Sequence, residues 1–442
     1  MALDLLEKKA AVHSERPNLE FAYKLCGVIE FVAGPTNSPG VKQFRKLIIQ
    51  RIGLRKVLET YSVAQEAQVA HHLWRVFQDK GANLEDHIES VTEAFIIKIV
   101  YGYNVDPVKA DPVASMVRNA TDVFSKTLVP GTFLVDFIPV LKYWPSWMPG
   151  GDFKNKARAH KKTLDDAADI PYDFVKRKMA SGEPPVCFVS EALREMSVGG
   201  VVTPEDEHVI KQAAMASCAG AGHTIVPTLE ALYLSMSMNP EVQRKAQKEI
   251  DRVVGNSRMP TFSDRTNLPY LNAIVMEVQR WHPVVPMGLP HMAGAEDVVE
   301  GFRIPKGALF LSNLWLYTRD PQRYHDPEAF MPERYLEPWN EPSPRDLIFG
   351  MGRRICPGRT FVDSVMFLTF AQVLAVFDIR KAVDGKGKAI EPTHVFQSGV
   401  LSKLGPFQVL VEARSPQHEL LIKEGIGKYP WEKSDVDELR VS

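Results

Sequence analysis

One cysteine of this chain stands in a basic, glycine-rich surrounding. The stretch 349–361 reads FGMGRRICPGRTF, so Cys356 follows two glycines and two arginines and precedes a proline and a third glycine. Glycine permits bends and close approaches that a Cβ would block, and nearby cations lower the pKa of a thiol and favour the thiolate. The apolar run beyond Gly358 predicts a helix whose N-terminal amides face the sulfur.

A stable thiolate can serve as a nucleophile or as a metal ligand, whereas most lone cysteines are simply small buried residues. A catalytic thiol needs a histidine base nearby, and this segment has none. The four cysteines are scattered without a CxxC pair, which argues against zinc or disulfides and favours a reducing compartment. The pattern therefore suits axial ligation of a haem iron.

Composition excludes some other classes of protein. The net charge of −1 offers no basic surplus for nucleic acid. The longest apolar stretch, 365–377, is shorter than the ~20 residues of a membrane span and predicts a buried core helix. The N-terminal residues are charged and amphipathic, so we expect neither a secretory signal nor a transmembrane anchor.

Helical periodicity dominates the rest of the sequence. Thr203 as N-cap and Pro204 at the first position predict the start of a long helix over 203–238. We expect further helices over 54–78 and 87–102 and in the segments that begin NPEVQ and LPYLN. A broken proline-rich stretch is expected over 129–152 and a linker over 183–203. Short strands are expected within 297–304 (with a turn at 306–307), 308–312 and 407–413. The fold class is mainly α with small β-sheets.

Phe349, Gly352, Arg354, Cys356 and Gly358, at these spacings, resemble the haem-thiolate signature of the cytochrome P450 monooxygenases of microsomal, fungal-like type. The resemblance implies heme b with Cys356 as the axial iron ligand, Phe349 packed against the sulfur and Arg354 paired with a haem propionate. It also implies one large domain over 1–442, with the thiolate loop and its following helix at 349–377.

Glu277 and Arg280 lie three residues apart in a helix that is apolar nearly all round. Such a pair is usually a solvated salt bridge, but the apolar helix predicts that it is buried and needs further partners. The family resemblance supplies Arg334, in FMPERYL, as the third member of a structural charge cluster. By composition His291 is as readily a surface histidine, whereas the resemblance places it against a propionate.

The stretch CAGAGHTIVPTLEAL resembles the family's distal helix. By that resemblance Gly220 leaves room for O2, and Thr224 supplies the hydroxyl that relays protons. His223 stands where the family has an acid: it either relays protons or points away and hydrogen-bonds to a backbone carbonyl. Pro227 removes the donor for the His223 carbonyl and predicts a bend at 223–224.

The resemblance also suggests a substrate pocket and a departure from the family. The pocket would draw on Ser217, Cys218, 284–289 and 398–400, which are mainly apolar and small and indicate a lipophilic substrate. The family's early Trp-x-x-x-Arg pair is not found, since the residue four beyond Trp74, the first tryptophan, is Gln78. We expect 1–53 to be shortened or divergent, with 27–48 too rich in proline and glycine for that helix and part of the N-terminal sheet missing.

Three functions remain open at this point. The first is a monooxygenase of secondary metabolism that inserts one oxygen atom from O2 into a lipophilic small molecule, with electrons from an NADPH-cytochrome P450 reductase. The second is a haem enzyme that rearranges or dehydrates peroxides without a reductase. The third is a truncated, non-catalytic remnant that retains haem poorly.

Over 140–162, a group of aromatic residues lies beside a group of basic residues, which suits a membrane interface. The alternative is a core-facing loop followed by a solvated helix. By resemblance the protein lies at the cytosolic face of the endoplasmic reticulum membrane, and without an anchor it would be peripheral or cytoplasmic.

Overall fold

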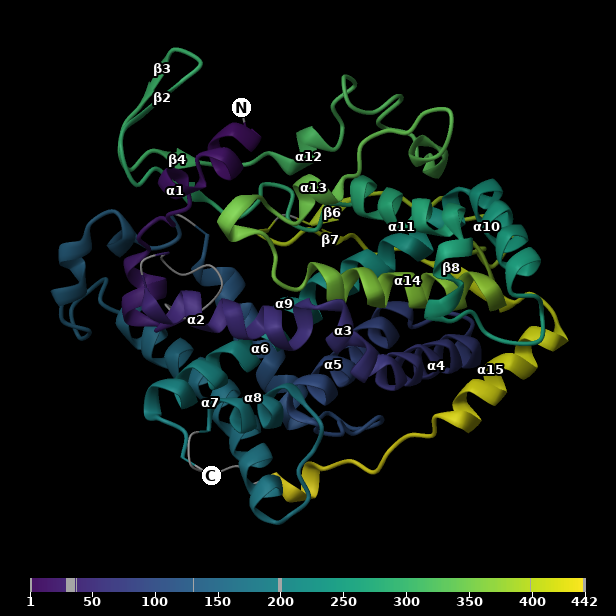
Figure 1. The fold of residues 1–442 in the computed structure, drawn as a ribbon, viewed down its shortest axis with the longest axis horizontal. Helices are drawn as coiled ribbons and strands as arrows, with labels where there is room; N and C mark the ends of the chain where they lie inside the picture. Colours follow the sequence, from purple (N-terminus) through teal and green to yellow (C-terminus); the bar gives the residue numbers. More distant parts are fainter. Residues whose placement is uncertain are drawn as a thin grey trace.

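The computed structural model describes residues 2–28, 36, 38–129, 131–197, 201–397 and 399–439. Most of this part of the chain is helical, and the long helix α9 crosses the middle of the molecule (Figure 1). The α-helices are α1 (Ala10–His13), α2 (Pro39–Ile48), α3 (Arg55–Leu58), α4 (Ser62–Asp79), α5 (Leu84–Tyr101), α6 (Pro112–Thr127), α7 (Phe153–Ala180), α8 (Phe188–Met196), α9 (Pro204–Met238), α10 (Pro240–Val253), α11 (Pro269–Trp281), α12 (Leu314–Tyr317), α13 (Arg345–Ile348), α14 (Arg359–Val376) and α15 (Pro416–Lys428).

The strands of the described residues are short and pair only in twos, all antiparallel: β1 with β4, β2 with β3, β5 with β8, and β6 with β7. The strands are β1 (His291–Met292), β2 (Asp297–Val299), β3 (Phe302–Ile304), β4 (Leu309–Phe310), β5 (Phe377–Lys381), β6 (Phe396–Gln397), β7 (Lys403–Leu404) and β8 (Val409–Ala413). The mainly α fold class with small sheets is therefore confirmed.

The start of α9 follows from its sequence. The Thr203 hydroxyl accepts a hydrogen bond from the Asp206 amide at 3.1 Å, and Pro204 occupies the first turn, as predicted. The helix continues without interruption through Pro227 to Met238. The bend expected at 223–224 stays a prediction.

Helix α14 forms the apolar partner of α9 in the core. It is the one described helix long and apolar enough to cross a membrane, and 72% of that window is buried inside the protein. The sequence indicated a buried core helix here, and the packing of α14 against α9, α10 and α11 agrees with that interpretation.

Some local predictions were wrong. Residues 183–203 are not simply a linker, because α8 lies within them: the Cys187 sulfur accepts from the Ser190 amide, and the Ser190 hydroxyl accepts from the Cys187 amide, in a capping box. Within 297–304 the chain turns at Glu300 and Gly301, which have positive φ and join β2 to β3. The predicted positions Pro130, Gly199, Gly200 and Ser398 lie outside the described residues.

Part of the segment 27–48, which we expect to be too rich in proline and glycine for the family's early helix, is helical. Helix α2 begins at Pro39, where a proline costs nothing because the first helical amides have no partner within the helix. Val41, Phe44, Leu47 and Ile48 then provide one buried face.

A buried charge cluster joins α11 to the 3₁₀ turn Pro332–Tyr335. Glu277 accepts from Arg280 at 2.8 and 2.9 Å and forms an ion pair with Arg334 at 3.1 Å, and all three side chains are fully buried. The remaining donors of Arg280 bind the carbonyls of Thr318, Pro327 and Ala329. Arg334 also binds Glu341 at 2.8 Å, so two guanidinium groups meet two carboxylates.

Glu277→Gln keeps the shape of the side chain but leaves Arg280 without its carboxylate. We expect the free energy of unfolding to fall by about 3–5 kcal/mol, because an uncompensated buried charge remains. Urea denaturation would measure this change. The control is Glu241→Gln on the exposed face of α10, where a change of less than about 0.5 kcal/mol is expected; equal effects would contradict the role of the cluster.

Candidate active site

A tight loop presents Cys356 at the start of α14. The Cys356 amide donates to the Phe349 carbonyl at 2.7 Å, which closes the loop over a short 3₁₀ turn at Gly352–Arg354. Gly350 and Gly352 have φ of +76° and +59°, in the left-handed region that favours glycine. A Cβ on Gly352 would also meet the Leu6 carbonyl oxygen at 2.2 Å, so the loop packs directly against the N-terminal segment.

The thiol of Cys356 sits in a low-polarity environment. Burial raises its pKa, and this effect outweighs the Gly358 amide and the Arg45 and Arg359 cations, which lower the pKa. The prediction that Arg353 and Arg354 hold the thiolate needs correction: Arg353 is exposed, and the Arg354 Nε donates to the Ser14 carbonyl at 3.1 Å. A bound cation is therefore what would keep this sulfur deprotonated.

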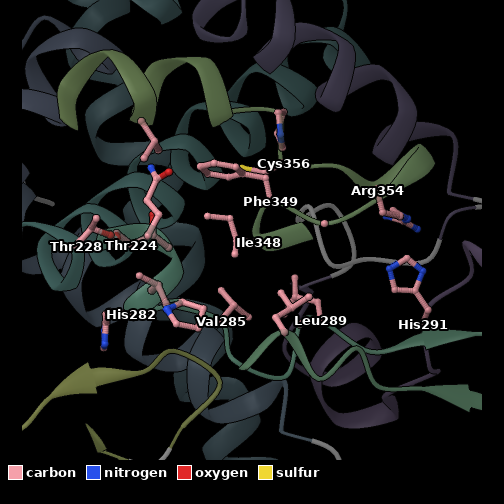
Figure 2. Close-up of a pocket in the computed structure, with 18 of the residues that line it drawn as sticks. Thr224, Thr228, His282, Val285, Leu289, His291, Ile348, Phe349, Arg354 and Cys356 are labelled. Carbon is pink, nitrogen blue, oxygen red and sulfur yellow. The ribbon is translucent and has the colours of Figure 1, made fainter. Parts of the chain in front are cut away.

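Two adjoining hollows lie between the cysteine loop and α9. One, of about 230 Å³, is lined by Phe349, Arg354 and Cys356 from the loop, by Thr224 from α9 and by His291 from β1 (Figure 2). The other, of about 210 Å³, is lined by apolar residues together with Gly220. The residues that line both hollows are Thr224, Val285, Leu289, Cys356, Pro357 and Val362.

One end of the larger of these two hollows is cationic. Arg354 and His291 lie at that end in Figure 2, and Arg16 also lines the hollow. Burial and the neighbouring arginines lower the pKa of His291 to about 4, so this imidazole is neutral at neutral pH. Burial lowers the pKa of Arg16 to about 9, so the arginines carry the positive charge at this end. Its described lining contains no carboxylate. An anionic group would relieve the cost of burying these cations.

The opposite end is formed by the hydroxyl face of α9. The Thr224 hydroxyl donates to the Gly220 carbonyl at 2.7 Å, and the Thr228 hydroxyl donates to the Thr224 carbonyl at 3.1 Å. Gly220 lines the adjoining apolar hollow and is exposed there, whereas the residues next to it in the helix are buried. This face is therefore open where Gly220 has no side chain, with the Thr224 oxygen beside it.

Not every predicted residue lies at this site. His223 points to the other side of α9, into a separate small cavity, and no described backbone carbonyl is found as its partner. Ser217 lines the apolar hollow, whereas Cys218 is fully buried and lines neither. Consecutive residues of an α-helix are rotated by about 100° around its axis, so adjacent side chains such as those of Ser217 and Cys218 face different sides.

The predicted loop 284–289 does reach the site. Val284, Val285, Gly288 and Leu289 line the larger of the two hollows, and Val400 lines the apolar one. Arg16, Gly288 and Leu289 also line a third hollow of about 440 Å³, which extends the space away from Cys356.

Two arginines that sequence reasoning missed also lie here. Arg16 donates to the Leu289 and Pro290 carbonyls, and its buried Nε has no partner among the described residues. Arg45, on α2, donates to the Ile355 carbonyl at 2.7 Å beside Cys356, and one of its buried nitrogens is likewise unpaired within the described chain. A search for the arginine of the family's Trp-x-x-x-Arg pair that did not require the tryptophan would have found Arg45. No pattern in the sequence marks Arg16.

Comparison with known proteins identifies the family. The model of the cytochrome P450 family matches residues 15–411, and the chain belongs to that family. It is an oxidoreductase of the monooxygenase class, which incorporates oxygen from O2, as the fold, the cysteine loop and the relatives agree.

The relatives are fungal proteins. The chain is 41% identical over 426 residues to the cytochrome P450 monooxygenase claR of Ampulloclitocybe clavipes, covering 96% of this chain and 78% of that protein. It is 38% identical over 440 residues to the cytochrome P450 monooxygenase CLM2 of Gibberella zeae, covering 99% and 83%. An O-methylsterigmatocystin oxidoreductase of Aspergillus flavus is 34% identical over 443 residues, covering 99% and 82%.

The site fits the haem-thiolate cofactor of this family. The donor set offers one thiol, and the unpaired buried nitrogens of Arg16 and Arg45 lie near it and suit carboxylates such as the haem propionates. The walls between these polar ends are mainly apolar, as a macrocycle requires.

Gly352→Ala tests the packing of the cysteine loop on the N-terminal segment. Gly350→Ala is the matched control, because a Cβ there meets nothing closer than the Arg354 carbonyl oxygen at 3.5 Å. The control should cost roughly 1–2 kcal/mol of unfolding free energy from left-handed strain alone. We expect Gly352→Ala to cost clearly more, since its Cβ also collides with Leu6, and equal losses in chemical denaturation would contradict this packing.

Proposed function

We propose that this protein binds heme b through Cys356 and inserts one oxygen atom from O2 into a lipophilic small molecule. The observation that carries the proposal is the position of the Cys356 thiol, which faces a hollow closed at one end by cations and at the other by the hydroxyl face of α9. When bound, haem supplies the oxidising chemistry, and a thiolate ligand favours O–O cleavage.

The polar residues of the site hold and orient this group. Arg16, Arg45 and Arg354 supply hydrogen-bond donors for its carboxylates. His291, whose Nδ1 is bonded to the His13 carbonyl, donates to them through Nε2 once it is protonated; the roles of Arg354 and His291 agree with those that the family resemblance implies. Phe349 lines the hollow beside Cys356 and keeps water from the sulfur. Glu277, Arg280 and Arg334 lie outside the hollows and fix the structure around them.

Residues of α9 prepare the oxygen side. Gly220 leaves space, and the Thr224 hydroxyl is placed to hold or pass a proton at the face of the larger hollow. The pocket for the substrate combines Val285, Leu289 and Val400 with Phe124 from α6, which favours a lipophilic compound. Electrons would come from an NADPH-cytochrome P450 reductase, and the fungal relatives support a place in secondary metabolism.

Cys356→Ser tests the proposed ligand. We expect the wild-type protein, reduced and treated with CO, to show the red-shifted Soret band of thiolate ligation, because a deprotonated sulfur donates strongly to the iron. The variant should lose this band. Optical spectra and the haem-to-protein ratio provide the measurement.

Cys26→Ser is the control, since Cys26 is buried away from these hollows and should leave the band in place. An unaltered spectrum in Cys356→Ser would overturn the proposal. Equal turnover with a hydroperoxide alone and with reductase, NADPH and O2 would instead favour peroxide chemistry without a reductase.

The surface of the proline-rich stretch supports membrane contact. The proline-rich stretch is not core-facing: Phe137 is 69% exposed and Trp147 is 82% exposed, with Leu134, Val140 and Tyr143 exposed beside them. Helix α7 follows with a run of lysines on its solvent side. We infer peripheral attachment at the cytosolic face of the endoplasmic reticulum through this patch, defined as residues 134–162.

Replacing Phe137 and Trp147 together by serine should weaken binding to phosphatidylcholine–phosphatidylserine vesicles by about tenfold or more, since two apolar anchors are lost. Co-sedimentation measures the bound fraction. Val108→Ser, at a residue 90% exposed elsewhere on the molecule, is the control. If wild-type protein stays in solution, the attachment through this patch is refuted.

A further inference from the structure

A second, smaller cavity lies behind the distal helix, on the side of α9 turned away from Cys356. Its volume is about 20 Å³, enough for a single water molecule. His223 and Glu230 line it from α9, seven residues and about two turns apart on the same face. Neither residue lines the hollows at Cys356, so the site described above does not account for them.

Both side chains are buried, and one of them has unsatisfied hydrogen-bonding capacity. His223 is 8% exposed and Glu230 is 6% exposed. The His223 Nδ1 has no hydrogen-bond partner within the described residues, and the Glu230 side chain lines the same cavity. Buried polar groups of this kind are normally satisfied, by ordered water where protein groups are lacking.

The opposite wall of the cavity is a ladder of carboxylates on α5. Glu85, Glu89 and Glu93 follow one another at intervals of four residues, so they lie on one face of that helix. Along this face burial increases, from exposed Glu85 through half-buried Glu89 to buried Glu93. The ladder therefore leads from solvent to the two residues of α9.

The two buried carboxyl groups at the cavity differ in their partners. Arg118, on α6, donates to both oxygens of Glu93, at 2.9 and 2.6 Å, and opposes the burial that raises the pKa of Glu93. Glu230 has no such cation; burial and then the charges of Glu85 and Glu89 raise its pKa to about 8, against a smaller opposite effect of Lys403. Glu230 thus carries a proton at neutral pH.

The pKa of His223 is shifted in the opposite direction to that of Glu230. Burial and then Lys403 lower its pKa to about 4, with a smaller lowering by Arg118 and an opposing effect of Asp122, also on α6. The imidazole is therefore neutral at neutral pH, and its unpaired Nδ1 either accepts or donates a hydrogen bond depending on the tautomer. A neutral imidazole and a protonated carboxyl that line the same cavity offer an acceptor and a donor to a water between them, with little net charge to bury.

We propose that Glu230, a water in this cavity and His223 form the proton entry to the distal face, replacing the acid that is missing beside Thr224. Glu230 gives its proton to the water, and the water gives one of its own to the His223 Nδ1. The resulting imidazolium releases a proton toward Thr224 by way of water at the His223 carbonyl and becomes neutral again, and Glu230 is reprotonated from solvent past Glu85 and Glu89. The inference rests on the proposed function, because it supplies the protons that O2 reduction requires.

The local backbone of α9 offers a path between its two faces. Pro227 has no amide hydrogen, so the His223 carbonyl lacks its usual helical donor. A water bound to that free carbonyl would lie at the peptide that joins His223 to Thr224, whose hydroxyl reaches the larger hollow at Cys356. His223 is a positioning and relay residue in this scheme, and Thr224 remains the group at the reacting site.

Infrared spectroscopy tests the buried acid without relying on turnover. In the haem-loaded wild type we expect a protonated-carboxyl band at pH 7 that disappears as the pH rises through about 8, since Glu230 then ionises. Glu230→Gln should abolish this band. Glu207→Gln, on the same helix but ion-paired with Lys176 at 3.0 Å, should retain it. A band that persists unchanged in Glu230→Gln overturns the proposal.

The relay itself is tested by oxygen consumption with reductase and NADPH at several pH values, in H2O and D2O. The wild-type rate should fall as the pH rises through about 8, because the donor loses its proton. Glu230→Gln should lower the rate at least threefold, remove this pH dependence and enlarge the solvent isotope effect. His223→Gln should have the same three effects. The double variant should be no slower than either single variant.

Additive losses, or a pH profile of Glu230→Gln that matches the wild type, overturn the relay. These outcomes can be told from failure of the proposed function. That failure would appear as the absence of the thiolate-type CO band in the wild type, whereas the infrared band of Glu230 is independent of the iron ligand.

Discussion

The hydrogen bond from the Cys356 amide to the Phe349 carbonyl, at 2.7 Å, is the contact on which the site depends. It closes the loop so that the sulfur leaves the backbone at the start of α14 and faces the hollow. The positive φ of Gly350 and Gly352 makes this closure feasible, and the lack of a side chain on Gly352 lets the N-terminal segment pack against the loop. That segment then delivers Arg16 to the same hollow.

Charge is distributed around this loop in two different ways. In the cluster of Glu277, Arg280, Arg334 and Glu341, positive and negative groups balance within hydrogen-bond distance. At the hollow, arginines and a histidine are gathered without carboxylates in its described lining. The first arrangement is complete within the chain and stabilises the fold, whereas the second is complete only with an anionic guest.

Local sequence patterns were sufficient for the features that depend on neighbours in the chain. The glycines around Cys356, the Thr203 cap and the apolar run of α14 all act within a few residues, and each was predicted. Arg16 was not, because its role arises from the approach of a distant segment to the carbonyls of Leu289 and Pro290. The side of α9 on which His223 lies follows from helical phase, but the carboxylates of α5 that face it do not. Cys187 was missed as a cap because sulfur is a weak acceptor.

The contrast between the two ends of the space beside Cys356 has a consequence for molecular recognition. The end with Arg16 and Arg354 is cationic, whereas the region near Ile48, Phe124 and Phe361 is hydrocarbon. If a flat amphiphilic guest bound in the reversed orientation, its acidic edge would lie against hydrocarbon and its apolar edge would lie against guanidinium groups. In the proposed function, this contrast favours one orientation of a nearly symmetrical guest over the other before any bond to sulfur forms.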